Sequence, residues 1–116
     1  MSRQIGKRSE ARALAYLQSL GYSFLDKNIF SDQGEIDLIV IDQSQVLHFV
    51  EVKYRQKVDE LAFESITAKK QKSMIHTARC YMDSHQTNIR FQAYSFSVLL
   101  HDDNEWFWIP DAFDGD

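Results

Sequence analysis

The chain has 116 residues, of which 44% are hydrophobic and 26% are charged, and this length and composition fit one globular domain over residues 1–116. No stretch approaches the roughly 18 uninterrupted apolar residues of a membrane-spanning helix, and no export signal is visible. Since the single cysteine, Cys80, cannot form an internal disulfide, we expect a cytoplasmic protein with no membrane association.

The net charge of -4 at first argues against a polyanionic partner, but the charge is unevenly distributed. Residues 101–116 hold six acidic residues and no lysine or arginine, which leaves 13 basic against 11 acidic residues before them. Local fields attract phosphate backbones more than total charge does. The overall charge therefore neither excludes nor supports a nucleic-acid partner.

The first half of the chain predicts one helix and then three strands. Residues 3–20 carry apolar Ala13, Leu14 and Leu17 at helical spacing, and Gly21 is typical of a helix C-terminus. Strands are expected at 22–30, 35–41 and 46–54, with turns at 31–34 and 42–45. Because these turns are too short for a crossover, the strands should form an antiparallel meander.

The second half predicts a helix over 60–84, a strand over 90–100 and a short edge strand over 105–109 before Pro110. A long helix between the third and fourth strands favours a parallel pairing with a right-handed connection. The expected fold is therefore α/β, with a mixed sheet flanked by two helices.

The strand at 46–54 carries charged side chains where a core is expected. Leu47, Phe49, Glu51 and Lys53 share one face and His48 lies on the other, since strand side chains alternate. Apolar residues on both faces indicate a strand covered on both sides. Burying Glu51 and Lys53 costs several kcal/mol each unless something compensates.

Two further acids are expected near Glu51. Asp37 lies on the neighbouring strand, and Glu10 lies on the helix stripe that should face the sheet. Carboxylates from adjacent strands can hold Mg²⁺ for phosphate chemistry, with Lys53 binding a phosphate oxygen or orienting the attacking water. The alternative is a buried ion-pair network in which Lys53 neutralises Glu51 and Asp37. Three acids against one lysine favour a cation.

Basic residues on the second helix suggest contacts with a phosphate backbone. Lys69, Lys72, His76 and Arg79 fall in one line along the helix, although such a line can also be a solvated face. Lys70 falls on the apolar line instead, so its ammonium should either lie near the sheet or snorkel past it, and with Gln71 it could reach a substrate phosphate.

Other residues give weaker signals. Arg55 continues the face of Glu51 and Lys53, with a salt bridge to Asp59 or Glu60 as its alternative role. The histidines show no ligand spacing, and His48 is expected to pack on the face opposite Glu51. No Ser-His-Asp set, glycine-rich phosphate loop or dinucleotide motif is evident.

The runs from Gly34 to Ile39 and from Phe49 to Arg55 closely resemble the YraN-like family of small bacterial proteins. That family is similar to the restriction-endonuclease-like PD-(D/E)XK superfamily, which also contains archaeal Holliday junction resolvases. The chain departs from the family pattern at Ser9, usually glycine, and at Gln92, usually aspartate. Further matches are Glu10 with Ala11, Ala15, Tyr16 and Leu17; Gly21-Tyr22; Asn28; Lys70-Gln71; Ala78; Arg90-Phe91; and Ala112-Phe113.

The resemblance implies the superfamily's αβββαβ core, in agreement with the element order above. It implies that Asp37, Glu51 and the backbone carbonyl of Val52 hold the metal and that Lys53 assists the nucleophilic water. Glu10 corresponds to the superfamily's first-helix glutamate. Lys70 or Gln71 falls where relatives carry a polar group near the phosphate.

These observations favour a Mg²⁺-dependent nuclease that hydrolyses DNA phosphodiester bonds, with branched or junction DNA as one candidate substrate and Mn²⁺ as an alternative ion. One alternative is a non-catalytic nucleic-acid-binding module whose affinity comes from Lys69, Lys72 and Arg79. Another is a protein-interaction subunit that uses its aromatic and acidic C-terminal segment. A homodimer would suit a two-strand or branched substrate, but no residue pattern indicates one.

Overall fold

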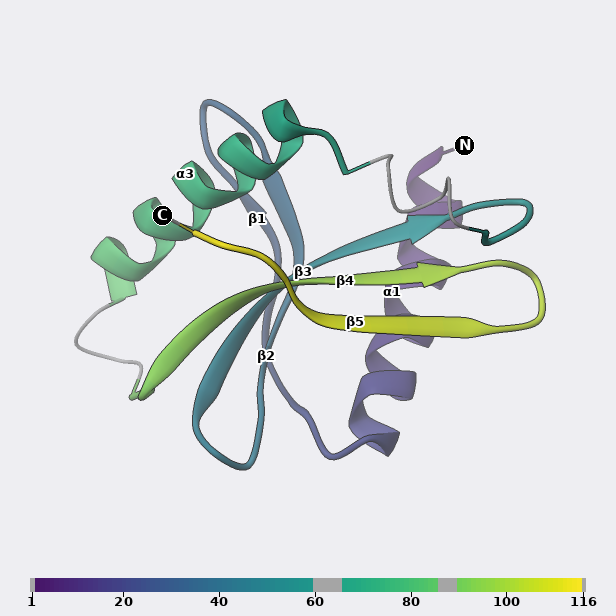
Figure 1. Ribbon diagram of the computed structural model, residues 1–116, viewed down its shortest axis with the longest axis horizontal. Helices are drawn as coiled ribbons and strands as arrows, with labels where there is room; N and C mark the ends of the chain where they lie inside the picture. The colour runs from purple at the N-terminus through teal and green to yellow at the C-terminus, as the bar shows by residue number, and fades with distance from the viewer. Residues whose placement is uncertain (1, 60–65, 86–89, 116) are drawn as a thin grey trace.

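The computed structural model describes residues 2–59, 66–85 and 90–115, which form an α/β fold with a five-stranded mixed sheet and two helices (Figure 1). No helix among these residues is long and apolar enough to cross a bilayer. In chain order the elements are α1 (Ser2–Ser19), β1 (Ser23–Phe30), β2 (Glu35–Ile41), β3 (Val46–Tyr54), α3 (Ala68–His85), β4 (Ala93–His101) and β5 (Trp106–Phe113).

The sheet has the strand order β1-β2-β3-β4-β5. β1, β2 and β3 pair antiparallel, β3 and β4 pair parallel over nine residues, and β5 pairs antiparallel with β4. The predicted meander and parallel pairing are therefore confirmed. The parallel step requires a crossover, and α3 lies in the connection between β3 and β4.

The helix α1 ends as its sequence predicts. Gly21 has a positive φ of 99°, which glycine adopts at little cost. The N–H of Tyr22 donates to the carbonyl of Leu17 at 3.1 Å, and the N–H of Gly21 donates to the carbonyl of Gln18 at 3.0 Å. These two bonds form a Schellman motif, which terminates the helix and turns the chain into β1.

The helix α3 begins later than predicted. Residues 60–65 of the predicted helix lie outside the described residues, and residues 66 and 67 are not helical. Thr67 is the N-cap, since its Oγ1 accepts a hydrogen bond from the N–H of Lys70 at 3.2 Å. The helical spacing of apolar residues around Ile66 predicted a helix there. In the structure Ile66 precedes the helix and is buried against Val98 and Leu100 of β4.

Two strand boundaries also differ from the prediction. β4 starts at Ala93 rather than Arg90, and β5 continues through Pro110 to Phe113 instead of ending at residue 109. Proline is tolerated because β5 is the edge strand and the pairing with β4 shifts register beyond Val98. Asp111 in this irregular stretch has a φ of 52°.

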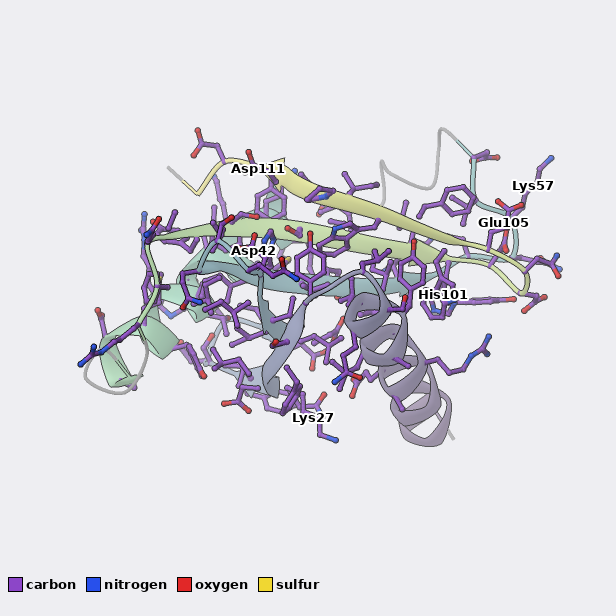
Figure 2. All side chains as sticks on the ribbon, turned by 90° about the horizontal axis from the view of Figure 1, so that it is seen from below. Lys27, Asp42, Lys57, His101, Glu105 and Asp111 are labelled. Carbon is purple, nitrogen blue, oxygen red and sulfur yellow. The ribbon has the colours of Figure 1, made fainter. Side chains whose placement is uncertain are left out.

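The two helices pack on opposite faces of the sheet. Ala13 and Leu17 of α1 contact a core that includes Val50, whereas Met74 and Ala78 of α3 contact a core that includes Phe49. Successive strand residues point to opposite faces, so Glu51 points to the same side as Phe49, toward α3. Figure 2 shows the side chains that fill the space between α1 and the sheet.

Candidate metal centre and nucleic-acid interface

Asp37 and Glu51 lie next to each other on β2 and β3. Leu38 and Val50 are the last paired residues of β2 and β3 at this end, and Asp37 and Glu51 come directly beyond them on the α3 face, with a hydrogen bond between their carboxyl groups. Asp37 Oδ2 accepts a hydrogen bond from the N–H of Val52 at 2.8 Å. Glu51 is only 5% exposed. The predicted pairing of these two carboxyl groups is therefore present in the fold.

The two carboxyl groups of this pair repel each other's ionisation, which favours positive charge beside them. Burial, followed by the hydrogen bond and negative charge of Glu51, raises the pKa of Asp37 to about 8, although the Val52 N–H opposes the rise. Two close, buried carboxyl groups cannot both ionise at neutral pH, so the pair retains a proton. A bound cation would remove this penalty and replace the proton.

Lys70 supplies the positive charge that contacts the pair. Its Nζ lies 2.9 Å from Glu51 Oε2. That oxygen is buried, and the ammonium of Lys70 balances its negative charge. Burial would lower the pKa of Lys70, but Glu51, Asp37 and Glu35 together raise it. The position of Lys70 near the sheet agrees with its place on the apolar line of α3.

Lys53 and Glu10 do not join this ion pair. Lys53 lies two residues beyond Glu51 on β3 and is partly exposed. In the ion-pair alternative Lys53 was expected to neutralise Glu51, but in the structure Lys70 forms that ion pair. Glu10 is half-buried on α1, which packs on the other face of the sheet. Within the described ranges no three Asp, Glu, His or Cys side chains are grouped closely enough to hold a metal ion. The catalytic roles of Lys53 and Glu10 stay predictions.

The residues present nevertheless fit Mg²⁺, which binds proteins through one or two carboxylates and keeps several waters. Asp37 and Glu51 supply the carboxylates, and Glu51 Oε2, which contacts the Lys70 ammonium at 2.9 Å, has no partner of good hydrogen-bond geometry within the described ranges. The N–H of Val52 points to Asp37, and in a strand the carbonyl of the same residue faces the same neighbour. The Val52 carbonyl therefore faces β2, on the same side as Asp37, where it would be a third oxygen ligand for the ion.

An open groove lies beside the first turns of α3, lined by Gln33, Lys69, Lys72 and Ser73, with a volume of about 470 Å³. Gly34 allows α3 to approach the β1–β2 turn closely, because a Cβ there would lie 2.9 Å from Ser73 Oγ. Lys69 and Lys72 are exposed. The groove thus carries two positive charges on the helix that also supplies Lys70.

The other predicted nucleic-acid contacts are bonded within the protein. Arg79 Nη2 donates to the carbonyl of Gly115 at 3.4 Å. Gln71 Nε2 donates to the carbonyl of Ile66 at 3.1 Å, and Arg55 Nη1 donates to the carbonyl of Tyr54 at 3.0 Å. His76 Nε2 lies 3.0 Å from Asp32 Oδ1. The line of basic residues on α3 is therefore least engaged at Lys69 and Lys72.

Sequence reasoning missed a buried polar network around His48. The His48 ring lies 3.0 Å from Asp42 Oδ2 and, through Nδ1, 3.0 Å from Ser97 Oγ. His48 packs on the face opposite Glu51, as predicted. The structure nevertheless brings together an Asp-His-Ser set, which was not evident in the sequence. Ser97 is fully buried and also accepts a hydrogen bond from the N–H of Asp111, so the network stabilises structure. The sequence signal for this network is weak: Asp42 and His48 lie six residues apart, on either side of the turn between β2 and β3.

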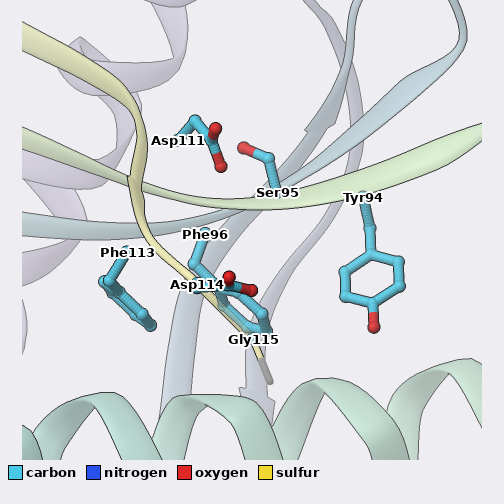
Figure 3. Close-up of a pocket in the computed structure, with 7 residues that line it drawn as sticks. All are labelled: Tyr94, Ser95, Phe96, Asp111, Phe113, Asp114 and Gly115. Atoms are coloured by element: carbon cyan, nitrogen blue, oxygen red, sulfur yellow. The ribbon is translucent and has the colours of Figure 1, made fainter.

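A smaller cavity of about 220 Å³ lies between β4 and the C-terminal segment (Figure 3). Figure 3 shows the side chains of Ser95 and Asp111 turned toward each other, with Asp114 on the opposite side of β4. The lining of this cavity is mixed in charge, because Asp111 and Asp114 are acidic whereas Arg79 donates to the carbonyl of the lining residue Gly115. The lysine-lined groove is the better candidate for phosphate contacts.

Comparison with known proteins places the chain in one family. The model of the uncharacterised protein family UPF0102 matches residues 9–98. A UPF0102 protein of Helicobacter pylori strain P12 is 40% identical over 89 residues, covering 77% of this chain and 75% of that protein. A UPF0102 protein of Coxiella burnetii strain RSA 331 is 36% identical over 115 residues, covering 98% and 95%. The YraN-like resemblance is thereby confirmed, and the chain belongs to the uncharacterised protein family UPF0102.

Proposed function

We propose that this protein is a metal-dependent phosphodiesterase that cuts DNA, with Mg²⁺ held by Asp37, Glu51 and the Val52 carbonyl. The observation that carries the proposal is the buried pair of facing carboxyl groups, in which the pKa of Asp37 is raised to about 8. Strongly perturbed carboxyl groups of this kind are typical of functional sites. Mn²⁺ would satisfy the same oxygen ligands.

The fold supports membership of the PD-(D/E)XK nuclease superfamily. The order α1, three strands, α3 and a parallel β4 matches the αβββαβ core that the resemblance implies. The acidic motif of the superfamily corresponds to Asp37, Glu51 and Lys53. The agreement of element order with motif position supports nuclease chemistry more strongly than either one alone.

The chain's own residues would divide the reaction between them. Lys53, on the face of Glu51, would orient the attacking water or bind a non-bridging phosphate oxygen. The water oxygen bonds to phosphorus while one ester bond breaks, and the departing oxygen takes a proton, leaving a terminal phosphate and a terminal hydroxyl. When bound, Mg²⁺ would supply positive charge for the developing negative charge on the phosphoryl oxygens.

The groove beside α3 would hold the adjoining DNA backbone. Lys69 and Lys72 line it, and both lie on the same helix as Lys70. Arg55, Gln71 and Arg79 each donate one side-chain hydrogen bond to a backbone carbonyl, and the two arginines would contact phosphate through their remaining N–H groups. A nucleic-acid-binding module without turnover is the second candidate, because the groove supports binding whether or not metal is held.

A cleavage assay tests the proposal. Purified protein with Mg²⁺ or Mn²⁺ is incubated with duplex, flap, four-way junction and single-stranded DNA. We expect cleavage of at least one substrate, its loss in Asp37→Asn and Glu51→Gln, and its retention in Lys27→Ala, whose side chain is exposed on β1. Absence of cleavage of every substrate by the unaltered protein would refute the enzymatic proposal. DNA binding that persists in EDTA would then favour the binding module.

A further inference from the structure

Lys70 occupies the position from which a cation would neutralise the acidic pair. Its ammonium lies 2.9 Å from Glu51 Oε2, and this glutamate side chain is only 7% exposed. The negative charges of Asp37 and Glu35 also act on Lys70. Lysine and metal would therefore compete for the same carboxylate.

The side chain of Lys70 is exposed and flexible enough to move away from Glu51. The side chain of Lys70 is 31% exposed, and its charge is carried on a flexible four-carbon chain. It is anchored on α3 one residue after Lys69, which lines the open groove. A divalent ion beside Glu51 would repel the ammonium, and water is within reach of the exposed part of the side chain.

We propose that Lys70 is an internal counter-ion, which holds Glu51 while the site contains no metal and releases it when a divalent cation binds. This inference rests on the proposed metal site at Asp37 and Glu51. It adds that the ion pair sets the metal affinity of the protein, since binding must break the contact between Lys70 and Glu51. It also places a released ammonium on the helix that carries the groove lysines.

Calorimetric titration with Mg²⁺ and Mn²⁺ in the absence of DNA tests this inference. We expect Lys70→Met to bind metal about tenfold or more tightly than the unaltered protein, because the competing cation is gone. Lys70→Arg keeps the charge and should bind no more tightly than the unaltered protein. The matched control is Lys27→Met, which removes an exposed charge from β1 and should change affinity by less than about twofold.

A second measurement uses the unaltered protein, because removing Lys70 leaves Glu51 without its partner and could prevent folding. Lysine acetylation by a limiting amount of acylating reagent is quantified by mass spectrometry with and without Mg²⁺. Labelling of Lys70 should rise severalfold on metal addition, while labelling of Lys69 and Lys72 stays constant.

The outcomes separate the two proposals. If metal binds with equal or lower affinity in Lys70→Met, or if Mg²⁺ leaves Lys70 labelling unchanged, the counter-ion inference is wrong and the metal site stands. If neither the unaltered protein nor a folded Lys70→Met variant binds metal, the proposed metal site is wrong and the inference is lost with it.

Discussion

Two histidine–aspartate pairs in this protein have the same geometry but different surroundings. His48 and His76 each place Nε2 3.0 Å from an aspartate oxygen. The His48 side chain is 6% exposed, whereas that of His76 is 36% exposed and its partner Asp32 is 80% exposed. Solvent screens the second pair, whereas His48 and Ser97 bond to each other out of contact with water, so loss of His48 weakens a buried network. Burial, rather than distance, sets the value of each contact.

We therefore expect the two histidines to differ in their effect on stability. His48→Ala should lower the free energy of unfolding by about 2–4 kcal/mol, because Ser97 and Asp42 lose a buried partner. His76→Ala should lower it by about 0–1 kcal/mol. Urea unfolding followed by circular dichroism measures both. Equal losses in the two variants would contradict this account.

The raised pKa of Asp37 predicts a pH-dependent stability. In the unfolded chain Asp37 loses its proton near its ordinary value of 3.8, whereas in the folded protein it keeps the proton to about pH 8. The unfolded state thus binds fewer protons between these values, so stability falls as the pH rises from about 4 to about 8. We expect a loss on the order of 2–4 kcal/mol in metal-free protein, measured by urea unfolding at several pH values.

The Asp37→Asn variant is the control for this pH dependence, because it cannot release the proton. Its stability should vary much less over the same range. Asp42 and Asp102 have lowered pKa values, so their contributions are lost only below about pH 4 and fall outside this window. A slope that survives in Asp37→Asn would show that another group is responsible.

At the level of elements, short local motifs fix where the helices end. The Schellman bonds at Gly21 terminate α1, and the Thr67 side chain caps α3. Both positions determine how a helix meets the sheet: α1 turns directly into β1, and α3 starts close to the groove lysines. Substitutions at these positions test whether the caps contribute to stability.

Gly21→Ala should lower the free energy of unfolding by about 1 kcal/mol, because alanine strains at a φ of 99°. The added Cβ would also lie 3.3 Å from Gln43 Nε2, although that side chain can move away. Gly21→Asn should cost less, since asparagine tolerates the left-handed region. Thermal unfolding compares the variants, and an alanine variant as stable as the original would contradict the predicted strain.

Thr67→Ala should lower the free energy of unfolding by about 1 kcal/mol, because the N–H of Lys70 loses its cap. Thr67→Ser keeps the hydroxyl and should be nearly neutral. Chemical denaturation of the two variants measures the difference. If both lose the same stability, the methyl group of threonine matters and the cap does not.

Across the described part of the molecule, the cavity beside the C-terminal segment and the groove beside α3 differ in the charged residues that line them. The acidic residues Asp111 and Asp114 line the cavity beside the C-terminal segment, whereas Lys69 and Lys72 line the groove beside α3. A protein of net charge -4 can therefore present a positive surface to a phosphate backbone. This basic surface is confined to the groove, and its contribution to DNA binding should depend on the salt concentration.

We expect DNA binding in EDTA to weaken steeply with salt and to depend on the groove. The double variant Lys69→Ala with Lys72→Ala should reduce the slope of log affinity against log salt by about two units for duplex DNA. Fluorescence anisotropy between about 50 and 200 mM salt measures the slope. Lys27→Ala, at an exposed position of β1 that does not line the groove, should leave the slope unchanged. An unaltered slope in the double variant would remove the groove from the interface.

The element order, the meander and the parallel crossover could all be predicted from the amino-acid sequence. Apolar periods of two and 3.6 residues and polar turns are local signals, and they survive in the fold. The alternation of β3 also placed Glu51 on the face opposite His48, so the two carboxyl groups of Asp37 and Glu51 were predictable. Family motifs at the same residues pointed to the same site.

Tertiary structure alone decided which partners these groups have. Lys70 rather than Lys53 pairs with Glu51, Glu10 lies on a helix across the sheet, and His48 meets Ser97 from a strand 49 residues away. Such contacts depend on how α3 is rotated over the sheet and on how β3 and β4 align in register. Neither quantity is encoded in a local period, because both are fixed by packing between segments that are distant in the chain.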